Sequence, residues 1–252
     1  MLVESRLEVL LDDENLLAVN KPAGLLTVPG RQGGVSLTEA VAQHTGIEQS
    51  LRLVHRLDRE TSGVLLLAKT LEAQRALSKQ FYDRKVQKEY LAIVRGRTEA
   101  DQGMIDAPLA PHPRVTSRMV VNEKKGRPAQ TEWFVEERFN NDIMLVRCFP
   151  KTGRQHQIRV HLAHIGLPLL VDELYAKSSA FFLSEVKSGY RPSSKHEERP
   201  LIARLTLHAK AITFVHPTTN QPIRIEAVPP KDFRATLTQL RKIKPLLRKN
   251  IG

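Results

Sequence analysis

One carboxylate of this chain lies in a segment where it could do chemistry. Asp58 falls in a polar turn that is expected between two apolar runs, residues 51–54 and 64–68. Three nearby residues can carry positive charge: His55, Arg56 and Arg59. Cationic surroundings keep a carboxylate ionised, and an ionised carboxylate can act as a nucleophile, a base or a stabiliser of positive charge. The alternative is an Asp that only hydrogen-bonds within its own surface turn.

The sequence around Asp58 is part of a longer series of motifs. Residues 54–63 read V-H-R-L-D-R-E-T-S-G, and V-L-L-L-A-K follows them. Residues 88–96 read K-E-Y-L-A-I-V-R-G, and residues 153–162 read G-R-Q-H-Q-I-R-V-H-L. With N-K-P-A-G-L at 20–25 and L-H-A at 207–209, the series resembles the RluA-type pseudouridine synthases over nearly the whole chain. Those enzymes isomerise uridine in RNA.

The resemblance implies a reaction and three catalytic residues. The bond from C1′ to N1 of uridine breaks, the base rotates and rejoins through C5, and the C5 proton leaves, so no redox cofactor or metal is needed. The resemblance assigns Asp58 as the essential carboxylate, Tyr90 as the ring on which the loose base stacks, and Arg159 as the cationic partner of Asp58. Whether Asp58 attacks C1′, adds to C6 or stabilises a charged or glycal-like sugar stays open.

The residues alone leave plainer alternatives for two of these positions. Tyr90 could be an ordinary half-buried tyrosine of a strand. Arg159 could belong to an exposed basic face of the helix expected over residues 152–164. The three-motif resemblance favours the catalytic interpretation of both.

Four further residues are candidate RNA contacts. A base inside a stem or loop must be extruded before it can react, and the resemblance implies that Arg56 fills the gap it leaves. Lys151, Arg154 and His156 are candidates for contacts to phosphate, which give affinity with little sequence selection. Cations near a helix N-terminus oppose the helix dipole, which favours a functional reason for them.

No metal site is expected. His156, His161 and His164 lack the spacing and the third ligand of zinc sites. Cys148 is the only cysteine, so neither an intrachain disulfide nor a cysteine-based metal framework is possible.

The composition supports a nucleic-acid partner. The 252 residues include 39 Lys and Arg against 27 Asp and Glu, a formal net charge of +12. Such an excess indicates a polyanionic partner, most simply nucleic acid. An anionic membrane surface is the other option, but no apolar run approaches the roughly 20 residues that span a bilayer. We expect a cytoplasmic protein, since the N-terminus lacks a signal-peptide core. We also expect it to be monomeric.

The apolar patterns predict an α+β fold, with a mixed, mainly antiparallel sheet and flanking helices. Helices are expected at 37–44, from Thr70 to about 81, and at 152–164. Strands are expected at 7–11, 16–20, 51–54, 64–68, 86–94, 130–139, 143–149, 205–215 and 223–228.

The chain is expected to comprise a catalytic domain over residues 1–230 and a basic segment over 231–252. Many relatives carry an S4-like domain before the catalytic domain, and here we expect a stand-alone catalytic domain. The basic segment has seven cationic residues against one Asp. It could be a docked helix facing RNA, which the charge favours, or a solvated terminal helix. Residues 178–200 are expected to form a polar surface insertion, with an aromatic pair at its start.

The match departs from the family pattern at residues 168–176. The family usually has P-I-x-G-D-x-x-Y-G there, whereas this chain has P-L-L-V-D-E-L-Y-A. Val171 and Ala176 replace two glycines, so any positive-φ turn at these positions must be rebuilt.

Two rival functions remain. A non-catalytic RNA-binding protein on the same scaffold would explain the charge but not the retention of all three catalytic candidates. A sugar or nucleoside hydrolase would need a second carboxylate across the bond, for which Glu60 is the near candidate. The sequence favours an RNA pseudouridine synthase acting on tRNA or rRNA.

Overall fold

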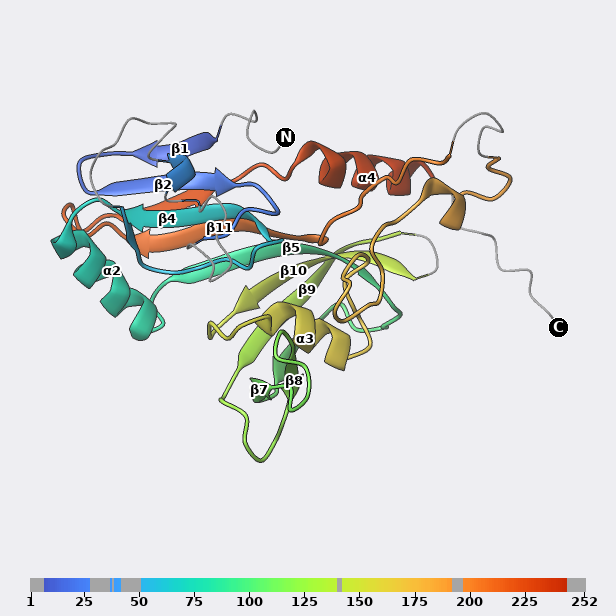
Figure 1. Cartoon of the computed structure of the whole chain (residues 1–252), viewed down its shortest axis with the longest axis horizontal. Helices are drawn as coiled ribbons and strands as arrows, with labels where there is room; N and C mark the ends of the chain where they lie inside the picture. The colour runs from blue at the N-terminus through green and yellow to red at the C-terminus, as the bar shows by residue number, and fades with distance from the viewer. Residues whose placement is uncertain are drawn as a thin grey trace. The chain divides into compact units, whose positions relative to one another are not determined.

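The structure is a computed structural model that describes residues 7–27, 37, 39–41, 51–139, 142–191 and 197–243 (Figure 1). The chain forms two compact units. Unit 1 comprises residues Met1–Tyr90 and His208–Pro229, and unit 2 comprises Leu91–Leu207 and Pro230–Gly252.

Unit 1 is built on a mixed sheet. Its strands follow the order β1-β2-β4-β11, and β3 and β12 pair with β4 and β11, respectively. The β4–β11 pair is parallel, and the β1–β2, β2–β4, β3–β4 and β11–β12 pairs are antiparallel. The bounds are β1 Glu8–Asp12, β2 Leu16–Lys21, β3 Arg52–Leu53, β4 Ser62–Ala68, β11 Leu207–Val215 and β12 Pro222–Glu226.

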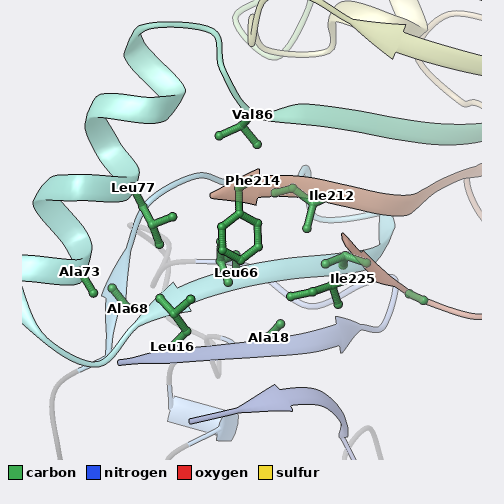
Figure 2. Packing of buried hydrophobic residues seen from close by; sticks show 12 residues of the cluster. Leu16, Ala18, Leu66, Ala68, Ala73, Leu77, Val86, Ile212, Phe214 and Ile225 are labelled. Carbon is green, nitrogen blue, oxygen red and sulfur yellow. The ribbon is translucent and has the colours of Figure 1, made fainter. Parts of the chain in front are cut away.

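The sheet of unit 1 is buried on both faces, which explains the uninterrupted apolar run of β4. Alternate side chains of β2 and β4 enter two different clusters. On one face, Leu66 packs with Leu77 of helix α2 (Leu71–Tyr82) and with Phe214 of β11 (Figure 2). Helix α2 begins as predicted at Thr70, whose side-chain oxygen accepts a hydrogen bond from the N–H of Ala73.

Unit 2 holds the strand order β5-β10-β9-β6, with β9 antiparallel to β10 and to β6. Helix α3 lies beside the separate hairpin of β7 and β8 (Figure 1). The bounds are β5 Gln87–Arg95, β6 Gln102–Asp106, β7 Leu109–Pro111, β8 Met119–Val121, β9 Gln130–Arg138, β10 Ile143–Pro150, α3 Gln157–His164, the 3-10 turn Leu183–Glu185 and α4 Lys231–Lys242. Strand β5 begins in unit 1 and continues into unit 2.

The basic C-terminal segment begins as a docked helix. Phe233, Leu237 and Leu240 of α4 are buried in the main cluster of unit 2 with Ile93 of β5. These three residues lie on the buried face of α4, and the residues from 244 onward lie outside the described part of the chain.

The predicted fold class is confirmed: the sheets are mixed and mainly antiparallel, with flanking helices. The helix predicted at 37–44 falls largely outside the described residues. The helix predicted from Thr152 begins only at Gln157, so its predicted start was wrong. Thr152 instead links the start of α3 to β9, because its hydroxyl donates to Oε1 of Gln157 at 2.7 Å and accepts from the N–H of Gln130 at 3.1 Å.

Two details of residues 168–181 bear on the sequence predictions. Neither Val171 nor Ala176 is among the described positions with positive φ, whereas Lys177 has φ 55°. Since neither residue has a positive φ, the replacement of the two family glycines requires no strained backbone at either position, and Val171 packs in the core. Phe181, expected in a surface insertion, is also buried in that core and pairs with Ile202.

Candidate active site

The turn that carries Asp58 is fastened on both sides by backbone hydrogen bonds. The N–H of Thr61 donates to the carbonyl of Asp58 at 3.1 Å and closes the turn. Before Asp58, the carbonyl of Leu57 accepts from the buried Thr27 hydroxyl at 2.9 Å. After it, the carbonyl of Arg59 accepts from the N–H of Gly24 at 2.9 Å. The backbone around Asp58 is therefore held by hydrogen bonds to the carbonyls of residues 57, 58 and 59.

A fully buried lysine completes this frame. Nζ of Lys21 donates to the carbonyls of Pro22 at 2.9 Å, Leu25 at 2.8 Å and Arg59 at 2.9 Å. Burial lowers the pKa of Lys21 to about 8, against the opposing attraction of Glu60 and Asp58. Lys21 thus joins the N-K-P-A-G-L segment to the Asp58 turn. Sequence reasoning matched that segment but missed this role, although a lysine ending an apolar strand was a signal.

His55 does not contribute positive charge beside Asp58. Desolvation, followed by the charge of Lys88, lowers the pKa of His55 to about 3. Its Nε2 accepts a hydrogen bond from the N–H of Leu66 at 3.0 Å, and its ring stacks on Phe81 with centroids 4.9 Å apart. His55 is therefore a neutral structural ring, and counting it among the cations of the turn was wrong.

The two arginines of the turn and Glu60 lie at the surface. Arg56 is exposed. Arg59 donates through Nε to the carbonyl of Gly24 at 3.0 Å and lies 3.5 Å from the carboxylate of Glu60. Glu60 is thus an exposed residue with a cationic neighbour.

Tyr90 belongs to the same unit as Asp58. It is half-buried on β5 and packs against the second cluster of unit 1, which includes Leu57 and Leu65. Burial raises the pKa of Tyr90 well above its usual range, and the negative charge of Asp58 raises it further. The Tyr90 hydroxyl therefore keeps its proton at neutral pH.

Arg159 forms a two-pronged ion pair within unit 2. Its Nε and Nη2 lie 2.8 Å from Oδ2 and Oδ1 of Asp172, and both side chains are buried. Asp172 Oδ1 also accepts from the N–H groups of Leu174 and Tyr175. Sequence reasoning missed Asp172, which lies 13 residues from Arg159. The predicted pairing of Arg159 with Asp58 concerns residues of different units and stays a prediction.

Tyr175 contacts two of the predicted site residues, His156 and Arg159. Its hydroxyl accepts from the N–H of Met119 at 2.9 Å and lies 2.9 Å from Nδ1 of His156. Arg159 and Arg118 both lie against its ring, at 5.0 and 5.3 Å from the centroid. Burial raises the pKa of Tyr175. Tyr175 thereby connects the β7–β8 hairpin, the start of α3 and the Arg159 ion pair.

The other predicted RNA contacts of unit 2 have protein partners at the surface. Lys151 Nζ lies 2.6 Å from a carboxylate oxygen of Glu132, and Arg154 Nε donates to the carbonyl of Pro128 at 3.1 Å. Lys151 is exposed and Arg154 partly so. Their roles in RNA binding stay predictions.

Two polar residues of the α3 motif hold the scaffold together. Gln157 accepts from the Thr152 hydroxyl and donates to the Thr131 hydroxyl at 3.0 Å. The ring nitrogens of His161 lie 2.9 Å from the Thr131 hydroxyl and the carbonyl of Ala107. Among the described residues, no three His, Cys, Asp or Glu side chains gather as metal ligands.

A membrane-spanning helix would have to be longer and more apolar than any helix found in the described parts of the chain.

Comparisons with known proteins agree on one family. Residues 15–164 match the model of the RNA pseudouridylate synthase family. "Ribosomal large subunit pseudouridine synthase C" of Yersinia pestis is 38% identical over 93% of this chain and 69% of that protein. "Ribosomal large subunit pseudouridine synthase D" of Xanthomonas campestris pv. campestris is 37% identical over 94% of this chain and 70% of that protein.

The fold agrees as well. The solved structure of "Human RNA Pseudouridylate Synthase Domain Containing 4" superposes with a TM-score of 0.69 at 26% identity, covering 93% of each chain. Family match, relatives and fold lead to the same conclusion: the chain belongs to the RNA pseudouridylate synthase family and is a pseudouridine synthase, an isomerase.

Proposed function

We propose that this chain isomerises uridine in the RNA of the large ribosomal subunit, with Asp58 as its catalytic carboxylate. The catalytic role of Asp58 is supported by the fixed backbone of its turn, in which the carbonyls of residues 57, 58 and 59 each accept a hydrogen bond. A fixed backbone on both sides holds a catalytic group in place before substrate arrives. The named targets of the relatives support ribosomal RNA over tRNA.

Tyr90 is the proposed platform for the detached base. Stacking on an aromatic ring tolerates rotation of the base and contributes about 1–3 kcal/mol. The raised pKa of Tyr90 leaves almost no phenolate at neutral pH, so its hydroxyl is a poor base for removing the C5 proton. The ring, more than the hydroxyl, is therefore the proposed functional part.

Arg159 is the proposed cationic partner of the reacting carboxylate. The Asp172 pair supports this role because it holds the guanidinium in one orientation. Arg56 is proposed to fill the space of the extruded base, since it is exposed and adjoins the Asp58 turn. Lys151, Arg154 and His156 are proposed phosphate contacts. Neither a cofactor nor a metal is needed for this isomerisation, and a monomeric cytoplasmic protein stays a prediction.

Release of tritium from C5 of labelled uridine tests the proposal. Wild type and Asp58→Asn are incubated separately with unmodified large-subunit ribosomal RNA and with unmodified tRNA. Asp83→Asn is the matched control, since Asp83 closes α2 and pairs with exposed Lys79. We expect stoichiometric release from ribosomal RNA by wild type and by Asp83→Asn, and none by Asp58→Asn.

The other outcomes decide between the alternatives. Release from tRNA alone would show that the substrate is tRNA and not ribosomal RNA. Full activity of Asp58→Asn would refute the catalytic assignment. RNA binding by wild type without release from either pool would favour a binding protein on the same scaffold.

A further inference from the structure

A buried hydrogen-bond relay begins directly after the Asp58 turn. The Ser62 hydroxyl lies 3.0 Å from Nδ1 of His208, and Nε2 of His208 lies 3.1 Å from the carbonyl of Ala227. Ser62 and His208 are both fully buried. We infer that His208 is a positioning residue for Asp58 that acts through Ser62, an inference that rests on the proposed function of Asp58.

The direction of the two hydrogen bonds follows from the acceptor at one end. A backbone carbonyl can only accept, so Nε2 of His208 carries a proton and donates to Ala227. In the neutral ring Nδ1 is then an acceptor, and the Ser62 hydroxyl donates to it. The relay thus uses the histidine as a bridge of fixed tautomer between three chain segments.

The strand pairing at this point is unusually close. His208 and Ala209 of β11 pair in parallel with Ser62 and Gly63 of β4. Gly63 has φ 119°, and a Cβ at this position would lie 2.1 Å from the carbonyl oxygen of Ala209. The backbone of β11 therefore fits against the start of β4 only because residue 63 has no side chain.

This junction lies four residues after Asp58. The N–H of Thr61, the residue before Ser62, closes the turn onto the carbonyl of Asp58. A shift of Ser62 is thus transmitted to Asp58 through the four peptide units between them and through the Thr61–Asp58 hydrogen bond. A misplacement of about 1 Å in a catalytic group can cost about 10²-fold in rate, so small movements at this relay matter.

Two substitutions separate the halves of the relay. His208→Asn places an amide oxygen near the position of Nδ1 and can keep the bond from Ser62 while losing the bond to Ala227. His208→Gln places an amide N–H near Nε2 and can keep the bond to Ala227 while losing the bond from Ser62. A purely structural histidine would show no preference between them beyond their effects on stability.

His216→Gln is the matched control, because His216 is a buried histidine just beyond the opposite end of β11. Its Nε2 lies 3.1 Å from Asp13, and its Nδ1 accepts from the N–H groups of Thr218 and Thr219. The readout is the single-turnover rate of tritium release at enzyme concentrations in excess over RNA and high enough that the rate no longer rises with enzyme, so that differences in RNA affinity do not affect it. Circular dichroism and the urea midpoint check the folding of every variant.

We expect His208→Gln to slow the single-turnover step by about 10²-fold, while His208→Asn and His216→Gln retain most of the rate. Ser62→Ala should slow the step as His208→Gln does, and the double variant should be no slower than either. Equal rates for His208→Asn and His208→Gln, or a His208→Gln rate matching His216→Gln, would overturn this inference alone. Activity in Asp58→Asn would overturn the proposed function as well.

Discussion

Replacement of Asp172 by Asn tests how the Arg159 ion pair is held. The substitution keeps an oxygen that can accept from the N–H groups of Leu174 and Tyr175, but it removes the charge opposite Arg159. In the wild type, two 2.8 Å hydrogen bonds join these side chains, whose exposed fractions are 7% for Arg159 and 0% for Asp172. A buried guanidinium without its counter-charge costs about 3–5 kcal/mol, which we expect as the loss in unfolding free energy.

The chain contains a matched but less buried pair in the same unit. Arg204 binds Asp232 in the same way, through Nε at 2.7 Å and Nη2 at 2.8 Å, but the Arg204 side chain is 14% exposed and that of Asp232 38%. Water can replace the lost partner there, so we expect Asp232→Asn to cost about 1 kcal/mol or less. Urea unfolding followed by fluorescence of the single Trp133, buried in unit 2, measures both variants. If Asp172→Asn cost no more than Asp232→Asn, burial would not govern the strength of the Arg159 pair.

Three further perturbations follow from the site in unit 1. The pKa of His55 is about 3 in the folded protein and near 6.5 in the unfolded chain. As the pH falls from 6.5 towards 3, only the unfolded state therefore gains a proton, and the folded protein loses stability over this range. His55→Gln should flatten the stability profile between pH 4 and 6 by up to about 1.4 kcal/mol per pH unit; an unchanged slope in urea titrations would mean that His55 titrates normally. Tyr90→Phe should keep most of the single-turnover rate and Tyr90→Ala should lose it, whereas equal losses would give the hydroxyl the larger role. Lys21→Met should lower the unfolding free energy by about 1–3 kcal/mol, because it leaves buried carbonyls without a donor. A thermal unfolding curve matching that of wild type would contradict the role of Lys21 in stabilising the Asp58 turn.

Local patterns in the sequence predicted most of the elements. Apolar periodicity and turn residues predicted strands β1, β2, β9 and β10 and the start of α2 at Thr70. Strands β6, β7 and β8 were not predicted. Two of them have only three residues, too few for a periodic signal. The start of α3 was misplaced because Thr152 resembles a helix cap, whereas its hydroxyl is engaged by Gln157 and Gln130.

For the candidate site too, the sequence determined some features and the tertiary structure decided the others. The sequence by itself determined the family, the reaction and the candidate residues Asp58, Tyr90 and Arg159, because these are matters of residue type in an ordered series of motifs. Only the tertiary structure decided which partners hold them: Lys21 beneath the Asp58 turn and Asp172 beside Arg159. It also decided the charge of His55. Hydrogen-bond partners and pKa values depend on distance and desolvation, and these arise only when segments far apart in the chain pack together.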